Sequence, residues 1–325
     1  MKILRDDEID PAPLAGKRVA ILGYGNQGRA QALNLRDSGI DVVVGLRPGS
    51  PSAQKAASDE VQVSSIEHAA ATADLIMLLA PDETMAALFR TIEPHLRRGA
   101  TLGFSHGLAI RFGFVSPRAD LDVIMVAPKG PGTALRSLYE AGQGMPALYA
   151  VAQDVSGSAE ALALAYGRAL GCGRAGLLPT SFAEECKADL FNEAAVVWGA
   201  VPEILIAGFD TLVDAGVSEE VAYMECVGEL KLLAELIEAR GIAAMREAIS
   251  NTAELGAVTG GKRIVDNRVR TEMRAMLAEI RNGDFAALLA DEEASGYPKL
   301  NAARTAATDE RVERARSSLS HLLGR

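Results

Sequence analysis

Two pairs of carboxylates in the second half of the chain could hold a metal ion. Asp189 and Glu193 are four residues apart, and Glu225 and Glu229 repeat this spacing. On a helix each pair would lie on one face, and apolar neighbours predict that both pairs are partly buried. Because a buried carboxylate is unstable without a counter-charge, a divalent cation is favoured, and an all-oxygen ligand set suits Mg2+. Two solvated helix faces are the alternative interpretation.

A glycine-rich loop near the start of the chain could bind the phosphates of a dinucleotide. It matches G-x-G-x-x-G and directly follows the apolar run at residues 18–22. The first glycine would permit a tight turn, the second the approach of a pyrophosphate, and the third close packing of the following helix. A glycine turn without a ligand is the alternative. The predicted cofactor-binding residues here are Gly23, Tyr24, Gly25, Asn26, Gln27 and Gly28.

The loop after the second apolar run indicates which dinucleotide binds. An NAD-binding domain usually carries an acidic residue about 20 positions after the glycines, but this sequence has Arg47, Ser50 and Ser52 there. An arginine and two hydroxyls are the groups expected around a 2'-phosphate. The sequence therefore favours NADPH; a polar surface loop with an incidental arginine is the alternative.

Two further polar side chains follow consecutive predicted strands. His106 comes at the end of one apolar run and Lys129 at the end of the next. Ligands bind at the carboxyl ends of parallel strands, so we expect both side chains near the cofactor. Pro131 and Gly132, which closely follow Lys129, are added to the predicted cofactor-binding residues.

The elements that must position these groups differ between the two halves of the chain. Apolar runs alternate with alanine-rich amphipathic stretches in the first half, which is the rhythm of a parallel sheet. From Ser181 onward heptad-like patterns predict helices instead. We expect a Rossmann α/β domain at 1–180 and an all-α domain at 181–325. The predicted strands are residues 18–22, 41–45, 74–80, 101–105 and 122–127.

Composition and charge exclude several classes of partner. The chain has 33 basic and 43 acidic residues and a formal net charge of -10, which argues against binding nucleic acid or anionic lipid. The acidic start lacks a secretory signal and no segment approaches the ~20 apolar residues of a membrane span, so we expect a cytoplasmic protein. Three cysteines without C-x-x-C spacing are expected to be small core residues.

Taken in order along the chain, these motifs resemble those of ketol-acid reductoisomerases of the short, class I type. They are GYGNQG, GLRPGSPS, SHG, MVAPKGPG, DLFNE, ECVGELKL and SNTAELG. The resemblance covers nearly the whole chain and implies a knotted helical second domain. It also implies a Mg2+-dependent alkyl migration in 2-acetolactate or 2-aceto-2-hydroxybutyrate. NADPH would then reduce the product to a 2,3-dihydroxy acid, on the route to valine and isoleucine.

The resemblance also implies a role for each acidic residue and an oligomer. Asp189 is similar to the ligand that bridges two Mg2+ ions, and Glu193 to its partner. Glu225 and Glu229 resemble a second pair that the neighbouring subunit supplies, which implies a homodimer or higher homo-oligomer with a shared active site. Apolar stripes in residues 190–237, broader than one small domain buries alone, favour the same assembly.

The remaining site residues are assigned by resemblance alone. His106, Lys129 and Glu229 correspond to the catalytic polar groups. Ser250 corresponds to the residue that binds the substrate carboxylate, and Ala253 lies in the segment that shapes the same pocket.

Several positions depart from the family pattern. Arg29 and Thr133 each replace a usual histidine, Lys187 an acid, Asn192 a glycine and Trp198 a cysteine. Arg29 could add a phosphate contact, whereas Lys187 removes a negative charge near the metal ligands. These changes leave open a paralogous NADPH-dependent reductase or reductoisomerase that acts on a different 2-keto or 3-hydroxy acid, or a non-catalytic NADP-binding protein.

Overall fold

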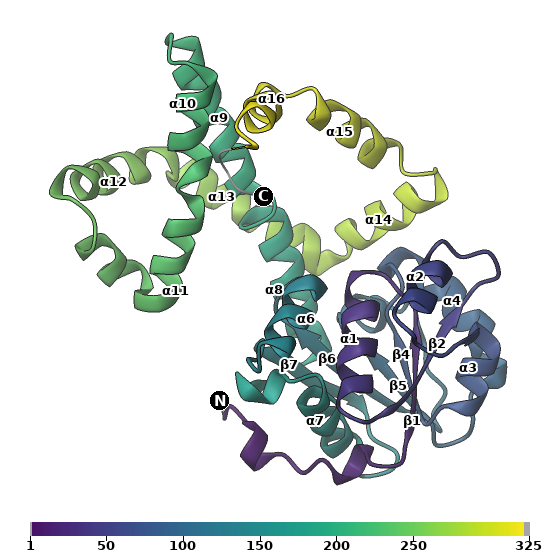
Figure 1. Ribbon diagram of the computed structural model, residues 1–325. Coiled ribbons are helices and arrows are strands. Elements are labelled where there is room, and N and C mark those ends of the chain that lie inside the picture. The colour runs from purple at the N-terminus through teal and green to yellow at the C-terminus, as the bar shows by residue number, and fades with distance from the viewer. Residues whose placement is uncertain (1, 322–325) are drawn as a thin grey trace. The chain divides into compact units, whose positions relative to one another are not determined.

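The computed structural model describes residues 2–321, and the chain divides into two compact units, Met1–Ala188 and Asp189–Arg325. The first unit is a sheet covered by helices and the second is made of helices (Figure 1). This confirms the predicted Rossmann domain followed by an all-α domain. The division falls inside helix α8 (Phe182–Ala195), which begins in the first unit and continues into the second.

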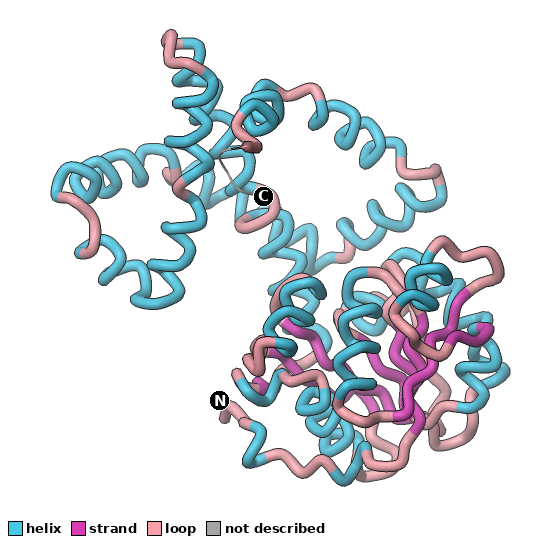
Figure 2. The backbone as a smooth tube through the Cα atoms, in the orientation of Figure 1, coloured by secondary structure: helices cyan, strands magenta, loops and turns pink. Residues whose placement is uncertain are grey.

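The first unit contains one eight-stranded sheet in the order β3-β2-β1-β4-β5-β6-β7-β8 (magenta in Figure 2). All five predicted strands are present. The strands are β1 (Arg18–Leu22), β2 (Asp41–Leu46), β3 (Val63–Ser65), β4 (Leu75–Leu78), β5 (Thr101–Phe104), β6 (Asp122–Pro128), β7 (Ala147–Gln153) and β8 (Leu177–Pro179). The sheet is not wholly parallel as predicted, because β7 runs antiparallel to β6 and β8 runs parallel to β7.

Helices cover both faces of this sheet, which explains why its central strands are apolar along their whole length. Helices α1 (Asn26–Asp37), α6 (Gly132–Glu140) and α7 (Ala159–Ala169) pack on one face. Helices α3 (Ile66–Thr72), α4 (Met85–Ile92) and α5 (Leu108–Arg111) pack on the other. Helix α2 (Ser52–Ser58) connects β2 and β3. Single 3-10 turns occur at Asp6–Glu8, Ala12–Leu14, Asp82–Thr84, Glu93–His95 and Cys172–Arg174.

The second unit has no strand among its described residues, and its core is small. Phe209, Tyr223 and Val312 form the centre of that core, contributed by α9, α10 and α16. A π-helical turn, Met224–Gly228, separates α10 from α11. After the end of α8, the helices are α9 (Ala200–Asp214), α10 (Glu219–Tyr223), α11 (Leu230–Glu247), α12 (Asn251–Ile264), α13 (Asn267–Asn282), α14 (Asp284–Ala294), α15 (Pro298–Thr308) and α16 (Arg311–Ser318).

Many large apolar side chains of the second unit are exposed in the single chain. Trp198, Leu255 and Ile264 are 64%, 65% and 63% exposed. The others are Val196, Val197, Ile204, Val221, Met224, Leu232, Leu233, Ile237, Ile242, Val258, Leu288 and Leu300. An apolar surface of this extent is typical of a surface that another molecule covers.

One helical stretch is longer and more apolar than the sequence analysis allowed. Phe182–Asp214 contains a window that is long and apolar enough to cross a membrane, and 6% of that window is buried. The prediction that no segment approaches the length and apolar character of a membrane span is therefore wrong. Length and composition alone are weak evidence for a membrane span, because a helix covered by another protein passes the same test.

The three cysteines lie where the sequence analysis expected them, in packed regions. Cys172 and Cys186 are buried and Cys226 is partly buried beside the helical core. None of the three, all within the described residues, forms a disulfide. Burial raises the pKa of the Cys172 thiol to about 12, so this thiol is unreactive at neutral pH.

Candidate active site

The glycine loop connects β1 to α1. At two of its glycines, main-chain atoms leave no space for a side chain. Gly23 has φ +105°, and a Cβ there would lie 2.7 Å from the carbonyl oxygen of Leu79. A Cβ on Gly28 would lie 2.1 Å from the carbonyl oxygen of Gly23. Gly25 differs, because nothing lies within 4 Å of its Cβ position. The space beside Gly25 is open, as a site for a pyrophosphate requires.

A cleft of about 850 Å³ opens beside this loop, within the first unit. The glycine loop, the loop after β2, residues of α4 and the residues that follow β4 and β5 line it. Its volume is in the range of cofactor and ligand sites. The predicted residues that line it are Gly23, Tyr24, Gly25, Asn26, Gln27, Arg47, Ser50, Ser52 and His106.

The loop between β2 and α2 forms a compact turn at the edge of the cleft. The backbone N–H of Ser50 donates to the carbonyl of Arg47 (3.1 Å), and the backbone N–H of Ser52 donates to the Ser50 hydroxyl (3.3 Å). Gly49 takes the left-handed conformation, with φ +71°. The turn thus brings together the arginine and the two hydroxyls that the sequence analysis selected.

Pro131 and Gly132 lie against the glycine loop rather than along the cleft. A Cβ on Gly132 would lie 2.1 Å from the carbonyl oxygen of Asn26, so the first turn of α6 touches the first turn of α1. The Gln27 side chain donates to the carbonyl of Gly130 (2.8 Å). The backbone N–H of Thr133 donates to the Asn26 side-chain oxygen (3.1 Å). These residues hold the loop in place.

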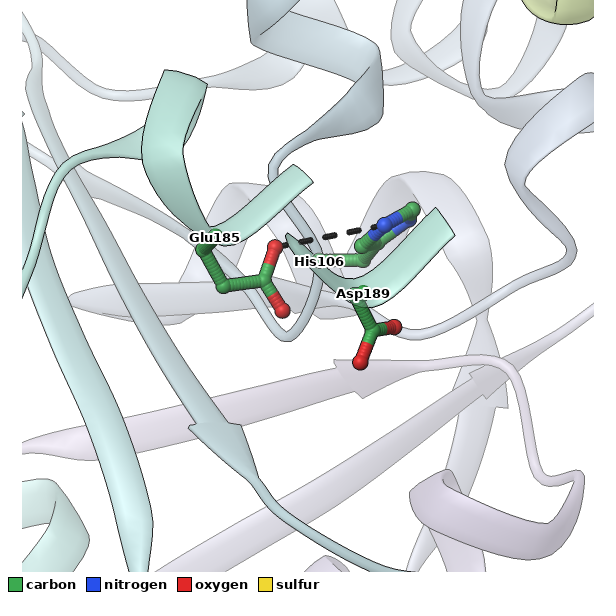
Figure 3. A group of neighbouring side chains, drawn as sticks. All are labelled: His106, Glu185 and Asp189. Carbon is green, nitrogen blue, oxygen red and sulfur yellow. Dashed lines mark ion pairs between the residues drawn. The ribbon is translucent and has the colours of Figure 1, made fainter. Parts of the chain in front are cut away.

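A second group of side chains lies where α8 begins, beside the end of β5. His106, Glu185 and Asp189 each offer one ligand atom, and these atoms lie within 4.8 Å of one another (Figure 3). Glu185 and Asp189 are one turn apart on α8, and His106 follows β5. His106 also lines the cleft, so one residue belongs to both sites.

Glu185 is the centre of this group, and the sequence analysis missed it. Its side chain is 1% exposed. One carboxylate oxygen accepts from the backbone N–H of Gly107 (2.8 Å), and the other lies 3.4 Å from the ammonium of Lys129. His106 Nε2 lies 3.9 Å from the carboxylate. The sequence signal for Glu185 was that it lies one helical turn before Asp189, on the same face of the helix.

His106 also contacts a second acid that the sequence analysis missed. Its Nδ1 lies 3.2 Å from Asp82, which follows β4. The imidazole is thus fixed between Asp82 and Glu185, with one ring nitrogen towards each. Glu185 therefore links His106 and Lys129, since it lies close to both side chains.

The other proposed metal ligands lie outside this group. Glu193, Glu225 and Glu229 are exposed in the single chain, so the predicted partial burial is wrong for these three. Asp189 alone is partly buried. Glu225 lies in the π-helical turn and Glu229 directly follows it. In residues 2–321, neither belongs to the group of potential metal ligands around His106.

Ser250 and Ala253 begin helix α12 in the second unit. The Ser250 hydroxyl accepts from the backbone N–H of Ala253 (3.2 Å) and caps the helix. Both residues are exposed. A serine that accepts in this way keeps its hydroxyl proton available as a donor.

The residues that depart from the family pattern lie in different surroundings. Arg29 donates to both carboxylate oxygens of Asp59 (2.6 and 2.7 Å), so its guanidinium is held in an ion pair. Lys187 and Trp198 are exposed.

A Rossmann sheet, a glycine loop that opens onto a cleft, and a helical second domain define a nicotinamide-dinucleotide-dependent oxidoreductase. The family described as "Acetohydroxy acid isomeroreductase, NADPH-binding domain" matches residues 13–176. The family described as "Ketol-acid reductoisomerase, C-terminal domain" matches residues 182–324. The chain therefore belongs to the ketol-acid reductoisomerase family.

Solved structures agree with this assignment. An NADH-preferring ketol-acid reductoisomerase from an uncultured archaeon is 42% identical, with 99% of each chain covered and a TM-score of 0.96. A putative oxidoreductase from Jannaschia is 19% identical, covering 84% of this chain and 98% of the other, with a TM-score of 0.62. A Plasmodium falciparum pyrroline carboxylate reductase is 15% identical, covering 83% and 98%, with a TM-score of 0.55. The last two share the fold.

The different surroundings of Gly25 and Gly28 lead to a prediction. Gly25→Ala should fold with an unchanged melting temperature, because its Cβ meets no protein atom, but it should bind the dinucleotide more weakly. The added methyl would occupy pyrophosphate space at a cost of about 1 to 3 kcal/mol. Gly28→Ala should lower the melting temperature even without cofactor. Thermal unfolding and cofactor titration of both variants measure this, and equal behaviour of the two would contradict it.

Proposed function

We propose that the protein is a Mg2+-dependent, NADPH-using ketol-acid reductoisomerase of branched-chain amino acid biosynthesis. Its substrates would be 2-acetolactate and 2-aceto-2-hydroxybutyrate. The position of His106 carries the proposal: this residue lines the dinucleotide cleft and also lies within 4.8 Å of the ligand atoms of Glu185 and Asp189. A substrate held near this imidazole would be close to both a hydride donor and a metal ligand.

The donor atoms around Asp189 fit a hard divalent cation. Carboxylate oxygens are the ligands that Mg2+ prefers, and Asp189 presents one beside an acid and an imidazole. Asp189 and Glu193 would hold the ions, together with Glu225 and Glu229 from a partner subunit. When bound, Mg2+ supplies a Lewis acid that polarises the substrate ketone and favours the deprotonated hydroxyl.

The polar side chains around the metal ligands would orient the substrate and stabilise its negative charge. The carboxylate of Glu185 accepts a hydrogen bond from Gly107 and pairs with Lys129. It therefore holds the Lys129 ammonium close to His106 and Asp189. This ammonium would stabilise negative charge on the substrate. Asp82 and Glu185 orient the His106 ring. Ser250 would donate its hydroxyl proton to the substrate carboxylate. NADPH, held by the residues of the glycine loop, would supply the hydride when bound.

The reaction itself is the first test of this proposal. Purified protein with Mg2+ and NADPH should convert 2-acetolactate to 2,3-dihydroxyisovalerate, and EDTA should stop turnover until Mg2+ is restored. Asp189→Asn removes the charge of a metal ligand and should lower kcat by at least about a hundredfold, while the dissociation constant for NADPH stays within about twofold. Chromatographic identification of the product and cofactor titration measure these effects.

A control variant and the opposite outcomes make this test specific. Asp291→Asn removes an acid from another helix of the second unit, and this change should leave activity unaltered. Reduction of 3-hydroxy-3-methyl-2-oxobutyrate without turnover of 2-acetolactate would identify a plain reductase. Near-normal turnover by Asp189→Asn would remove this residue from the metal site.

We further propose that the active site is shared between two copies of the chain in a cytoplasmic homodimer or a larger homo-oligomer. The exposed apolar side chains of the second unit support this, since burying them against a like surface is favourable. Glu225 and Glu229 are exposed and lie between the exposed apolar residues Met224 and Leu232 along the chain. Charged groups among apolar ones suit a protein partner that brings counter-charges and disfavour a lipid phase.

A mixing experiment tests the shared site. Asp189→Asn and Glu229→Gln should each be inactive alone. When the two are coexpressed and equally abundant, half of the dimers are hybrids with one intact site of two, so activity should recover to about one quarter of wild type. No recovery, despite hybrid dimers detected by differently tagged subunits, would mean that all four carboxylates act within one chain.

The cofactor preference is a separate prediction. Arg47, Ser50 and Ser52 line one end of the cleft and would bind the 2'-phosphate of NADPH. Arg47→Asp should erase or reverse a preference for NADPH, because losing a charge-assisted contact costs about 1.5 to 3 kcal/mol. The measurement is kcat/KM with both cofactors. The archaeal relative is NADH-preferring, and a wild-type protein that uses NADH equally well would contradict this prediction.

A further inference from the structure

Asp59 joins three elements of the cofactor domain through its carboxylate and its backbone. Arg29 of α1 donates to both carboxylate oxygens (2.6 and 2.7 Å). The hydroxyl of Tyr24, in the glycine loop, donates to the same carboxylate (2.9 Å). Arg36, two turns along α1, donates to the Asp59 carbonyl. Four donors thus converge on one residue, which we call the Asp59 clamp.

The clamp lies at one end of α2, and the proposed phosphate-binding loop lies at the other. Asp59 is the residue at which α2 ends, and its backbone N–H still donates to Lys55 (3.0 Å). Helix α2 begins at Ser52 and spans seven residues, about 10 Å at the usual rise. The loop that holds Arg47 and Ser50 is therefore fixed on one side by β2 and on the other by a helix whose far end is clamped.

The Asp59 carboxylate is ionised and is fixed by several hydrogen bonds. Its side chain is 13% exposed, and the bond from Arg29 holds its pKa below the ordinary value. A bidentate arginine–carboxylate pair is both stronger and more directional than a single hydrogen bond. Tyr24 lines the cleft and is 4% exposed, so the clamp also holds a residue of the glycine loop.

The clamp depends on a departure from the family pattern. Arg29 stands where the resemblance leads us to expect a histidine, and a histidine could not make the two parallel bonds that Asp59 receives. Two nitrogens of the Arg29 guanidinium are hydrogen-bonded to the Asp59 carboxylate. The arginine therefore acts on the cofactor site through α2.

We propose that Asp59 is a positioning residue that sets the selectivity for NADPH by fixing α2 and, through it, the loop of Arg47, Ser50 and Ser52. This inference rests on the proposed preference for NADPH. Loosening the clamp lets the loop move, and a bound 2'-phosphate must then order it again. NADH lacks that phosphate, so its binding does not depend on the position of the loop.

Asp59→Asn tests the inference with little change in shape. We expect KM for NADPH to rise about tenfold and KM for NADH less than about threefold, with kcat within about twofold of wild type. General destabilisation would affect both cofactors and kcat together. Arg29→Gln should give the same pattern, and the double variant should be no worse than either single one, because all three break the same pair.

A matched control and the wild-type protein separate the possible outcomes. Asp120→Asn also removes an acid that pairs with arginines of the cofactor domain, Arg118 and Arg98 (2.9 and 3.6 Å), neither of which touches Asp59, and should leave both KM values unchanged. If wild type prefers NADPH and neither clamp variant shifts the ratio of the two KM values, or if the two changes multiply, the clamp is overturned while the proposed function stands. If wild type shows no preference for NADPH, the proposed cofactor and this inference both fall.

Discussion

A buried negative charge at the start of α8 is the interaction on which the candidate active site depends. Glu185 is almost fully buried, and burying a carboxylate is unfavourable unless donors and a cation surround it. The backbone N–H of Gly107 and the ammonium of Lys129 meet that requirement. Because these donors follow β5 and β6, the same interaction fixes the first turns of α8 to the sheet. Asp189, one turn later on that helix, takes its position from this attachment.

A second constraint operates at the dinucleotide loop, where main chains approach too closely for side chains. Glycine is needed at position 28 because the carbonyl of Gly23 fills the space of a Cβ, and at position 132 because the carbonyl of Asn26 does. The first turns of α1 and α6 are consequently packed against each other, and hydrogen bonds from Gln27 and Thr133 reinforce the contact. The loop is therefore rigid before any cofactor arrives, which reduces the entropy lost on binding.

The sequence predicts this fold well where local pattern and physics coincide. The apolar runs become strands because both faces of the sheet are covered, and glycines are needed at positions 23 and 28 because main-chain atoms lie where a Cβ would be. The direction of β7 is not encoded in its own residues, since ALYAVAQ would suit either orientation. Glu185 was missed because it adjoins the exposed Glu184 in a polar stretch, and only the tertiary contact with Gly107 and Lys129 distinguishes the two.

The remaining predicted metal ligands are exposed in the single chain. Glu193, Glu225 and Glu229 are exposed, and so are Trp198 and many other apolar side chains of the same unit. Its own core is a small cluster around Phe209, too little apolar burial to hold so many helices firmly in place. The proposed second copy would cover the apolar side chains and change the surroundings of the acids in one step. Assembly, stability of the helical unit and affinity for metal would then be linked, because each stabilises the same arrangement.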